Sequence, residues 1–73
     1  MDNLKNSELQ DLYNNLREEL IRVTILVRKI RNEKATPKHL LPSLYKELQE
    51  IENRIDEVRA EALNRDLELS EFL

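Results

Sequence analysis

Apolar residues recur in two long seven-residue registers, and this spacing limits what the chain can fold into. In each register the apolar positions alternate steps of three and four residues, which keeps them on one face of a helix. The first register comprises Leu9, Tyr13, Leu16, Leu20, Val23, Val27 and Ile30, and the second comprises Leu41, Leu44, Leu48, Ile51, Ile55, Val58 and Ala62. We call these fourteen residues the seam. Two such registers, joined by a short stretch with two prolines, predict an all-α antiparallel hairpin of two helices.

Local signals predict where the first helix begins and ends. Ser7 and Gln10 have the spacing of a capping box, in which each side chain bonds the backbone of the other residue. Acidic residues precede and follow this point, and basic residues gather near residue 31, as the helix dipole favours. We therefore expect the first helix over about residues 7–33.

The two prolines shape the expected start of the second helix. Thr36 and Pro37 form a start signal, so we expect a single helical turn over 37–40. Pro42 lacks an amide hydrogen and disfavours helical angles in the residue before it. This predicts a kink before Pro42 and a main helix over about 42–64.

Composition narrows the class of protein. The 73 residues make a single domain, 1–73, and they include no glycine, cysteine or tryptophan. The chain therefore has no phosphate-cradling glycine loop, no disulfide and no thiolate site. His39, the sole histidine, has no carboxylate or cysteine at metal-ligand spacing. We expect no catalytic residue, no metal and no cofactor, and hence no enzyme.

Without a basic leader or an apolar run of about 18 residues, we expect a cytoplasmic location and no membrane contact.

A lone two-helix hairpin buries little surface, so we expect it to self-associate into a four-helix bundle. Apolar and aromatic residues outside or beside the seam are the candidate interface for a second copy or another protein. They are Leu12, Ile21, Ile25, Leu26, Leu40, Tyr45, Leu67 and Phe72. An alternative for Ile21 and Ile25 is that they are scattered exposed residues. Tyr13 and Tyr45 are expected to fill interfaces with their hydroxyl groups in water.

The C-terminal segment, residues 66–73, follows the point where Arg65 breaks the second register. Its large apolar residues, Leu67, Leu69, Phe72 and Leu73, fit no clear helical or strand pattern. The segment is expected either to dock loosely at the open end of the hairpin or to order on a partner.

Charge is distributed unevenly along the chain. Residues 22–46 carry seven basic residues against Glu33 and have a net charge of +6, whereas residues 1–21 carry −3 and residues 47–73 carry −6. The hairpin would have a basic tip and an acidic open end, which favours a head-to-tail dimer. The competing use of a basic tip is phosphate binding. The candidate contacts are Arg28, Lys29, Arg31, Lys34 and Lys38.

Most remaining charges have the pattern of a solvated helix surface. Acidic residues stand four positions before arginines in the pairs Glu18–Arg22, Glu50–Arg54 and Glu61–Arg65.

Taken together, these features of the sequence predict a non-enzymatic protein–protein interaction module, such as an adaptor, an inhibitor, a small chaperone or an assembly subunit. The alternative is a small nucleic-acid-binding regulator that uses the basic tip.

Overall fold

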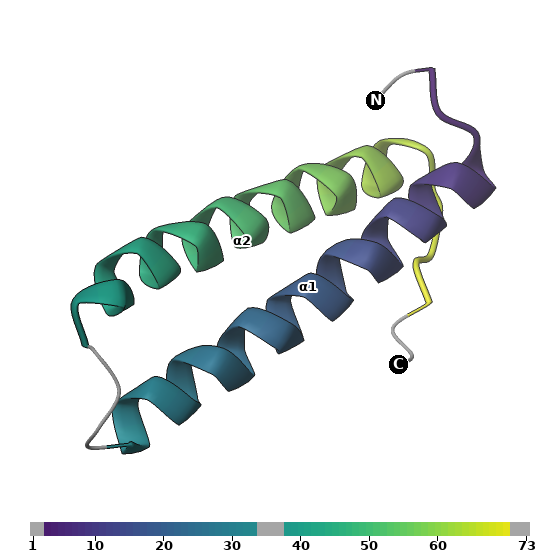
Figure 1. The fold of residues 1–73 in the computed structure, drawn as a ribbon. Coiled ribbons are helices and arrows are strands. Elements are labelled where there is room, and N and C mark those ends of the chain that lie inside the picture. The colour runs from purple at the N-terminus through teal and green to yellow at the C-terminus, as the bar shows by residue number, and fades with distance from the viewer. Residues whose placement is uncertain (1–2, 34–37, 71–73) are drawn as a thin grey trace.

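The computed structural model describes residues 3–33 and 38–70 of the chain. Helix α1 (Asn6–Asn32) is followed by the short 3₁₀ helix η1 (Lys38–Leu40) and by helix α2 (Leu41–Asn64). The two long helices pack against each other and run in opposite directions (Figure 1). The molecule is elongated, with principal extents of 47 × 21 × 15 Å. The predicted all-α hairpin is confirmed.

Helix α1 begins one residue before the predicted start. Lys5 is the N-cap, and its backbone N–H donates to Oε1 of Glu8 at 3.1 Å. A carboxylate in the first turn also interacts favourably with the helix dipole. The predicted capping box of Ser7 and Gln10 is therefore wrong. The helix ends at Asn32, where the Glu33 N–H still donates to the Lys29 carbonyl oxygen at 3.0 Å.

Helix α2 also begins one residue before its predicted start. Leu40 has helical backbone angles, φ −78° and ψ −18°, so η1 leads directly into α2. Pro42 lies in the first turn of α2, where a missing amide hydrogen deletes no helical hydrogen bond. The expected turn over 37–40 is present from Lys38 onward, and Pro37 lies outside the described residues.

Thirteen of the fourteen seam residues belong to the packed core of the hairpin, as the registers predict, and Ile30 is buried outside that cluster. Ten of the fourteen are buried, namely Leu9, Tyr13, Leu16, Val23, Val27, Ile30, Ile51, Ile55, Val58 and Ala62. The other four are half-buried and pack against this core, namely Leu20, Leu41, Leu44 and Leu48. Three of these four come from the first half of α2, so the core is best covered toward the open end of the hairpin.

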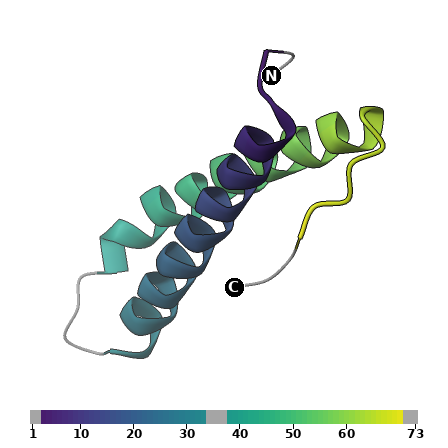
Figure 2. The ribbon, with the colours of Figure 1, turned by 90° about the vertical axis from the view of Figure 1, so that its right-hand side faces the viewer.

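A Schellman motif ends α2 and starts the C-terminal tail, by which we mean residues 67–70. The Leu67 N–H donates to the Ala62 carbonyl oxygen at 2.8 Å, and the Asp66 N–H donates to the Leu63 carbonyl oxygen at 3.2 Å. Asp66 takes the left-handed conformation, φ 54°, that glycine usually occupies in this motif. Figure 2 shows the tail turning back beside the hairpin. This reversal brings Leu67 and Leu69 against the core, where both are half-buried.

Candidate protein-interaction site

An apolar groove lies between α1 and α2 near the tip of the hairpin. Its volume is about 460 Å³, and its apolar lining residues are Val23, Ile25, Leu26 and Leu44. Charged residues of both signs complete the lining, namely Glu19, Arg22, Lys29 and Glu47. Ile25 is 59% exposed and Leu26 is 44% exposed, so a large part of the apolar surface faces solvent. We call this feature the apolar groove.

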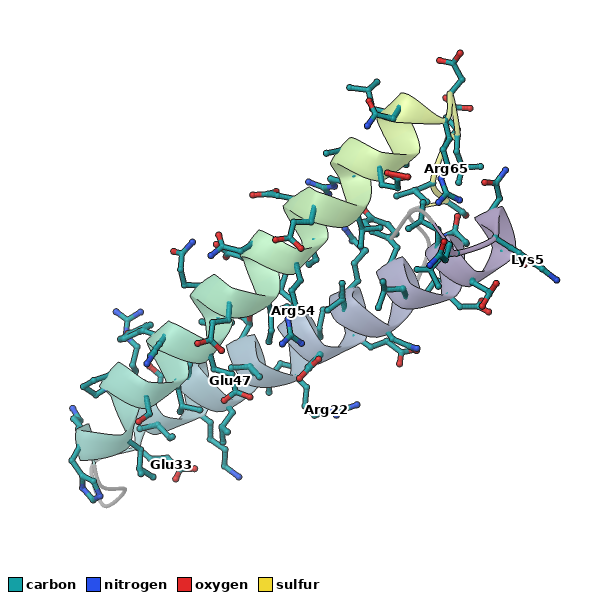
Figure 3. The ribbon with its side chains drawn as sticks, turned by 90° about the horizontal axis from the view of Figure 1, so that it is seen from above. Lys5, Arg22, Glu33, Glu47, Arg54 and Arg65 are labelled. Atoms are coloured by element: carbon teal, nitrogen blue, oxygen red, sulfur yellow. The ribbon has the colours of Figure 1, made fainter. Side chains whose placement is uncertain are left out.

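Helical periodicity places the groove residues together. Glu19, Arg22, Leu26 and Lys29 follow one another at steps of three and four residues, so they lie along the same side of α1. Figure 3 shows the side chains of Arg22 on α1 and Glu47 on α2 at a similar level along the hairpin. The groove therefore has an aliphatic floor between two charged edges that come from different helices.

The structure brings together only part of the predicted interface. Ile25 and Leu26 line the groove, whereas Ile21, Leu40 and Tyr45 are exposed elsewhere on the described surface. Leu12 packs against the core, and Leu67 is docked with the tail. Phe72 lies outside the described residues. Leu63, which the registers did not single out, is 77% exposed.

A second hollow near the tip contains two of the predicted phosphate contacts. Its volume is about 410 Å³, and it is lined by Thr24, Val27, Arg28, Arg31, Asn32 and Leu48. We call it the tip hollow. Lys29 lines the apolar groove instead, Lys38 lies in η1, and Lys34 is outside the described residues. The predicted phosphate-contacting residues that the structure describes therefore lie on several different surfaces.

The buried hydroxyl of Tyr13 is held by two arginines. It accepts hydrogen bonds from Nη1 of Arg17 at 3.3 Å and from Nη2 of Arg59 at 3.1 Å. The two guanidinium carbons lie 5.6 and 5.7 Å from the centroid of the tyrosine ring, within cation–π range. The prediction that this hydroxyl is in water is wrong, because the whole Tyr13 side chain is covered at the seam. The i, i+4 spacing from Tyr13 could have indicated Arg17, but nothing in the sequence indicates Arg59.

Polar contacts close the open end of the hairpin. Arg65 donates from Nη1 to the Leu4 carbonyl oxygen and to Oδ1 of Asn6, and from Nε to Oε1 of Glu61. The predicted Glu61–Arg65 pair is therefore present, at 3.1 Å. The other two predicted pairs, Glu18–Arg22 and Glu50–Arg54, do not form ion pairs within residues 3–33 and 38–70.

Gln10 connects α1 to the tail in place of its predicted capping role. Its Oε1 accepts from the Ser70 backbone N–H at 2.8 Å, and its Nε2 donates to the Ser70 carbonyl oxygen at 3.1 Å. This reciprocal pair joins residues 60 positions apart in the chain. The sequence did not indicate it, because the partner comes from a segment without regular secondary structure.

Within the described ranges, histidine, aspartate and glutamate side chains form no group of three that could hold a metal ion. In the same ranges, no helix combines the length and apolar character needed to cross a bilayer. Comparison of the chain with protein-family models, with curated proteins and with solved structures finds no match.

Proposed function

We propose that this protein is a non-enzymatic protein–protein interaction module that self-associates head to tail into a four-helix bundle through the apolar groove. The observation that carries this proposal is the groove itself, in which Ile25 and Leu26 are exposed beside Leu44. Apolar surface gathered in one groove gains free energy when another apolar surface covers it. The faces left uncovered by self-association are available to another protein.

The exposed surface supports a dimer. The chain has 5653 Å² of accessible surface for a mass of 8.7 kDa. A compact monomer of this mass is expected to expose only about 4700 Å². The radius of gyration is 14.9 Å, against about 11 Å for a compact domain of this length. The excess surface of about 900 Å² is close to the ~800 Å² that each partner buries in a standard interface. A second copy would therefore give the hairpin the burial typical of a compact domain.

Charge supports a head-to-tail arrangement. The tip segment, residues 22–46, has a net charge of +6, and the two segments that form the open end carry −3 and −6. Two hairpins packed in opposite directions place each basic tip beside an acidic open end. Each exposed pair contributes little, but the summed field favours this orientation and disfavours a side-by-side parallel one.

The spacing of α1 fits the same arrangement. Leu12, Glu19 and Leu26 are seven residues apart and therefore share one side of the helix. A symmetric head-to-tail interface on this side of α1 uses each of the two leucines twice, once from each copy.

Sedimentation equilibrium of two matched double variants tests the proposal. Ile25→Gln with Leu26→Gln removes the apolar lining, whereas Ile21→Gln with Leu63→Gln makes the same chemical change at exposed positions outside the groove. Glutamine is a good helix former, so both variants should keep their helicity by circular dichroism. We expect a dimer for the parent and the control, and a loss of about 3 kcal/mol of dimerisation free energy for the groove variant. This loss raises the dimer Kd roughly hundredfold.

A parent chain that stays monomeric at tens of micromolar would contradict the proposed self-association. Equal weakening by both double variants would show that the groove is not the interface. Thermal unfolding gives an independent check, because the Tm of a dimer rises with protein concentration.

A further inference from the structure

The tip hollow combines an apolar floor with two cationic side chains. Val27, which is buried, and Leu48 supply the aliphatic part, and Arg28 and Arg31 belong to the same lining. Thr24 and Asn32 complete it, so no carboxylate is among the residues that form the hollow. Two guanidinium groups beside aliphatic side chains, without a carboxylate in the lining, fit a ligand that is both acidic and apolar.

The tip hollow and the apolar groove lie on different sides of the hairpin. Thr24, Arg28 and Arg31 follow one another at steps of four and three residues on α1, and so share one side. Arg28 and Leu26 are two positions apart, which places them about 160° from each other around the helix axis. The tip hollow therefore remains open when a second copy covers the groove.

We propose that the tip hollow binds an acidic amphipathic segment of a partner protein. A leucine or phenylalanine of that segment lies on Val27 and Leu48, and neighbouring carboxylates accept hydrogen bonds from Arg28 and Arg31. Planar guanidinium groups match carboxylates with paired hydrogen bonds, and the aliphatic floor supplies the burial that a purely ionic contact lacks. This inference does not depend on self-association.

The surroundings of the hollow favour a peptide over a nucleic acid. Another hollow farther along the hairpin has Glu52 and Asp56 in its lining, together with Arg17 and Arg59. The charged side chains of that hollow cancel, so a phosphate backbone that extends from the tip toward the open end would gain no net positive charge there, whereas a short peptide covers the tip alone. The lining of the tip hollow also has no aromatic side chain on which a base could stack.

Fluorescence anisotropy with a defined peptide tests the proposal. The probe is a fluorescein-labelled peptide of sequence Glu-Glu-Leu-Phe-Glu-Glu-Leu-Leu-Glu, and the full chain is titrated into it. Arg28→Gln with Arg31→Gln should weaken the Kd at least about tenfold, as expected from the loss of charge-assisted hydrogen bonds. Lys46→Gln with Arg54→Gln makes the same change in net charge outside the hollow and should leave the Kd within about twofold.

Further measurements separate this proposal from the alternatives. The same peptide with glutamine in place of every glutamate should also bind the parent chain at least about tenfold more weakly. No binding of the acidic peptide, or equal weakening by both double variants, would overturn the proposal. Tighter binding of a twelve-nucleotide oligothymidine than of the peptide would instead assign the hollow to nucleic acid. Sedimentation of Arg28→Gln with Arg31→Gln should still show the parent's state of association. A double variant that no longer self-associates would show that the hollow belongs to the interface between two copies of the chain.

Discussion

Arg59 on α2 donates a hydrogen bond to the Tyr13 hydroxyl on α1, with Nη2 and the hydroxyl oxygen 3.1 Å apart. The contact joins residues 46 positions apart and crosses the seam at a place where the tyrosine is fully covered. A buried hydroxyl without a partner destabilises a fold, so the arginines make it possible to place a tyrosine in an otherwise aliphatic core. The contact forms because the packing of the seam brings these faces of the two helices together.

Removing the Tyr13 hydroxyl should destabilise the hairpin. Tyr13→Phe keeps the ring but deletes the acceptor for both Arg17 and Arg59, and we expect a loss of about 1–2 kcal/mol in the free energy of unfolding. Urea unfolding at fixed protein concentration measures it. Tyr45→Phe is the matched control, because this ring is 45% exposed. The control should change stability by no more than about 0.5 kcal/mol. Equal changes for the two variants would show that the buried hydrogen bonds contribute nothing.

Two residues at the middle of the seam should respond differently to truncation. Ile51 is 4% exposed, and Ile51→Ala should cost about 2–4 kcal/mol through lost burial and a cavity. Leu20 is only half-buried. Because Leu20→Ala removes less covered surface, it should cost about 1–2 kcal/mol. Chemical denaturation of both variants at one protein concentration tests this ranking. A larger loss at Leu20 would mean that it is covered in solution by something outside this chain.

Asp66 offers a stabilising substitution. Its left-handed conformation, φ 54°, is one that glycine adopts without steric cost. Asp66→Gly should therefore raise the free energy of unfolding by about 0.5–1 kcal/mol. Asp66→Ala removes the same carboxylate but keeps a Cβ, and it should give no such gain. Thermal unfolding of the two variants compares them directly. A similar gain from alanine would show that the charge near the helix C-terminus, and not the backbone, is the source of strain.

Deleting residues 66–73 should lower stability. The tail contributes two half-buried leucines and the reciprocal hydrogen bonds between Gln10 and Ser70, and it completes the end of α2. Ordering the backbone costs about 1–2 kcal/mol per residue, so the expected net loss is small, about 1–3 kcal/mol. Gln10→Ala in the full chain measures how much the hydrogen bonds to Ser70 contribute to this stability. An unchanged Tm after the deletion would show that the tail is not part of the folded hairpin.

The seam could be predicted because it depends on local spacing. Leu16, Val23 and Ile55 are buried simply because a seven-residue register keeps them on one side of a helix. The start of α1 was misplaced by one residue because local preference favours serine as the N-cap, whereas the structure uses Lys5 as the N-cap and the Glu8 side chain as the acceptor for its N–H.

The candidate site was predictable only in part. Exposed Ile25 and Leu26 were identifiable as apolar residues outside the register, but the groove also needs Leu44 and Glu47 from α2. The rotation of one helix relative to the other decides which side chains of the two helices share a surface. Two helices can pack at several different rotations, so the sequence does not fix this choice. The separation of Lys29 from Arg28 and Arg31, in contrast, follows from helix geometry alone, because successive residues differ by about 100° around the axis of α1.

Spacing along the chain is enough to predict two amphipathic helices, their antiparallel pairing and the charge difference between tip and open end, because each is a property of the sequence pattern. Tertiary structure alone decided that Arg59 meets Tyr13, that Gln10 holds Ser70, and that Arg65 reaches Leu4. These are single contacts between residues far apart in the chain. They depend on the rotation and offset of the helices, which the packing of the whole seam fixes and no local pattern encodes.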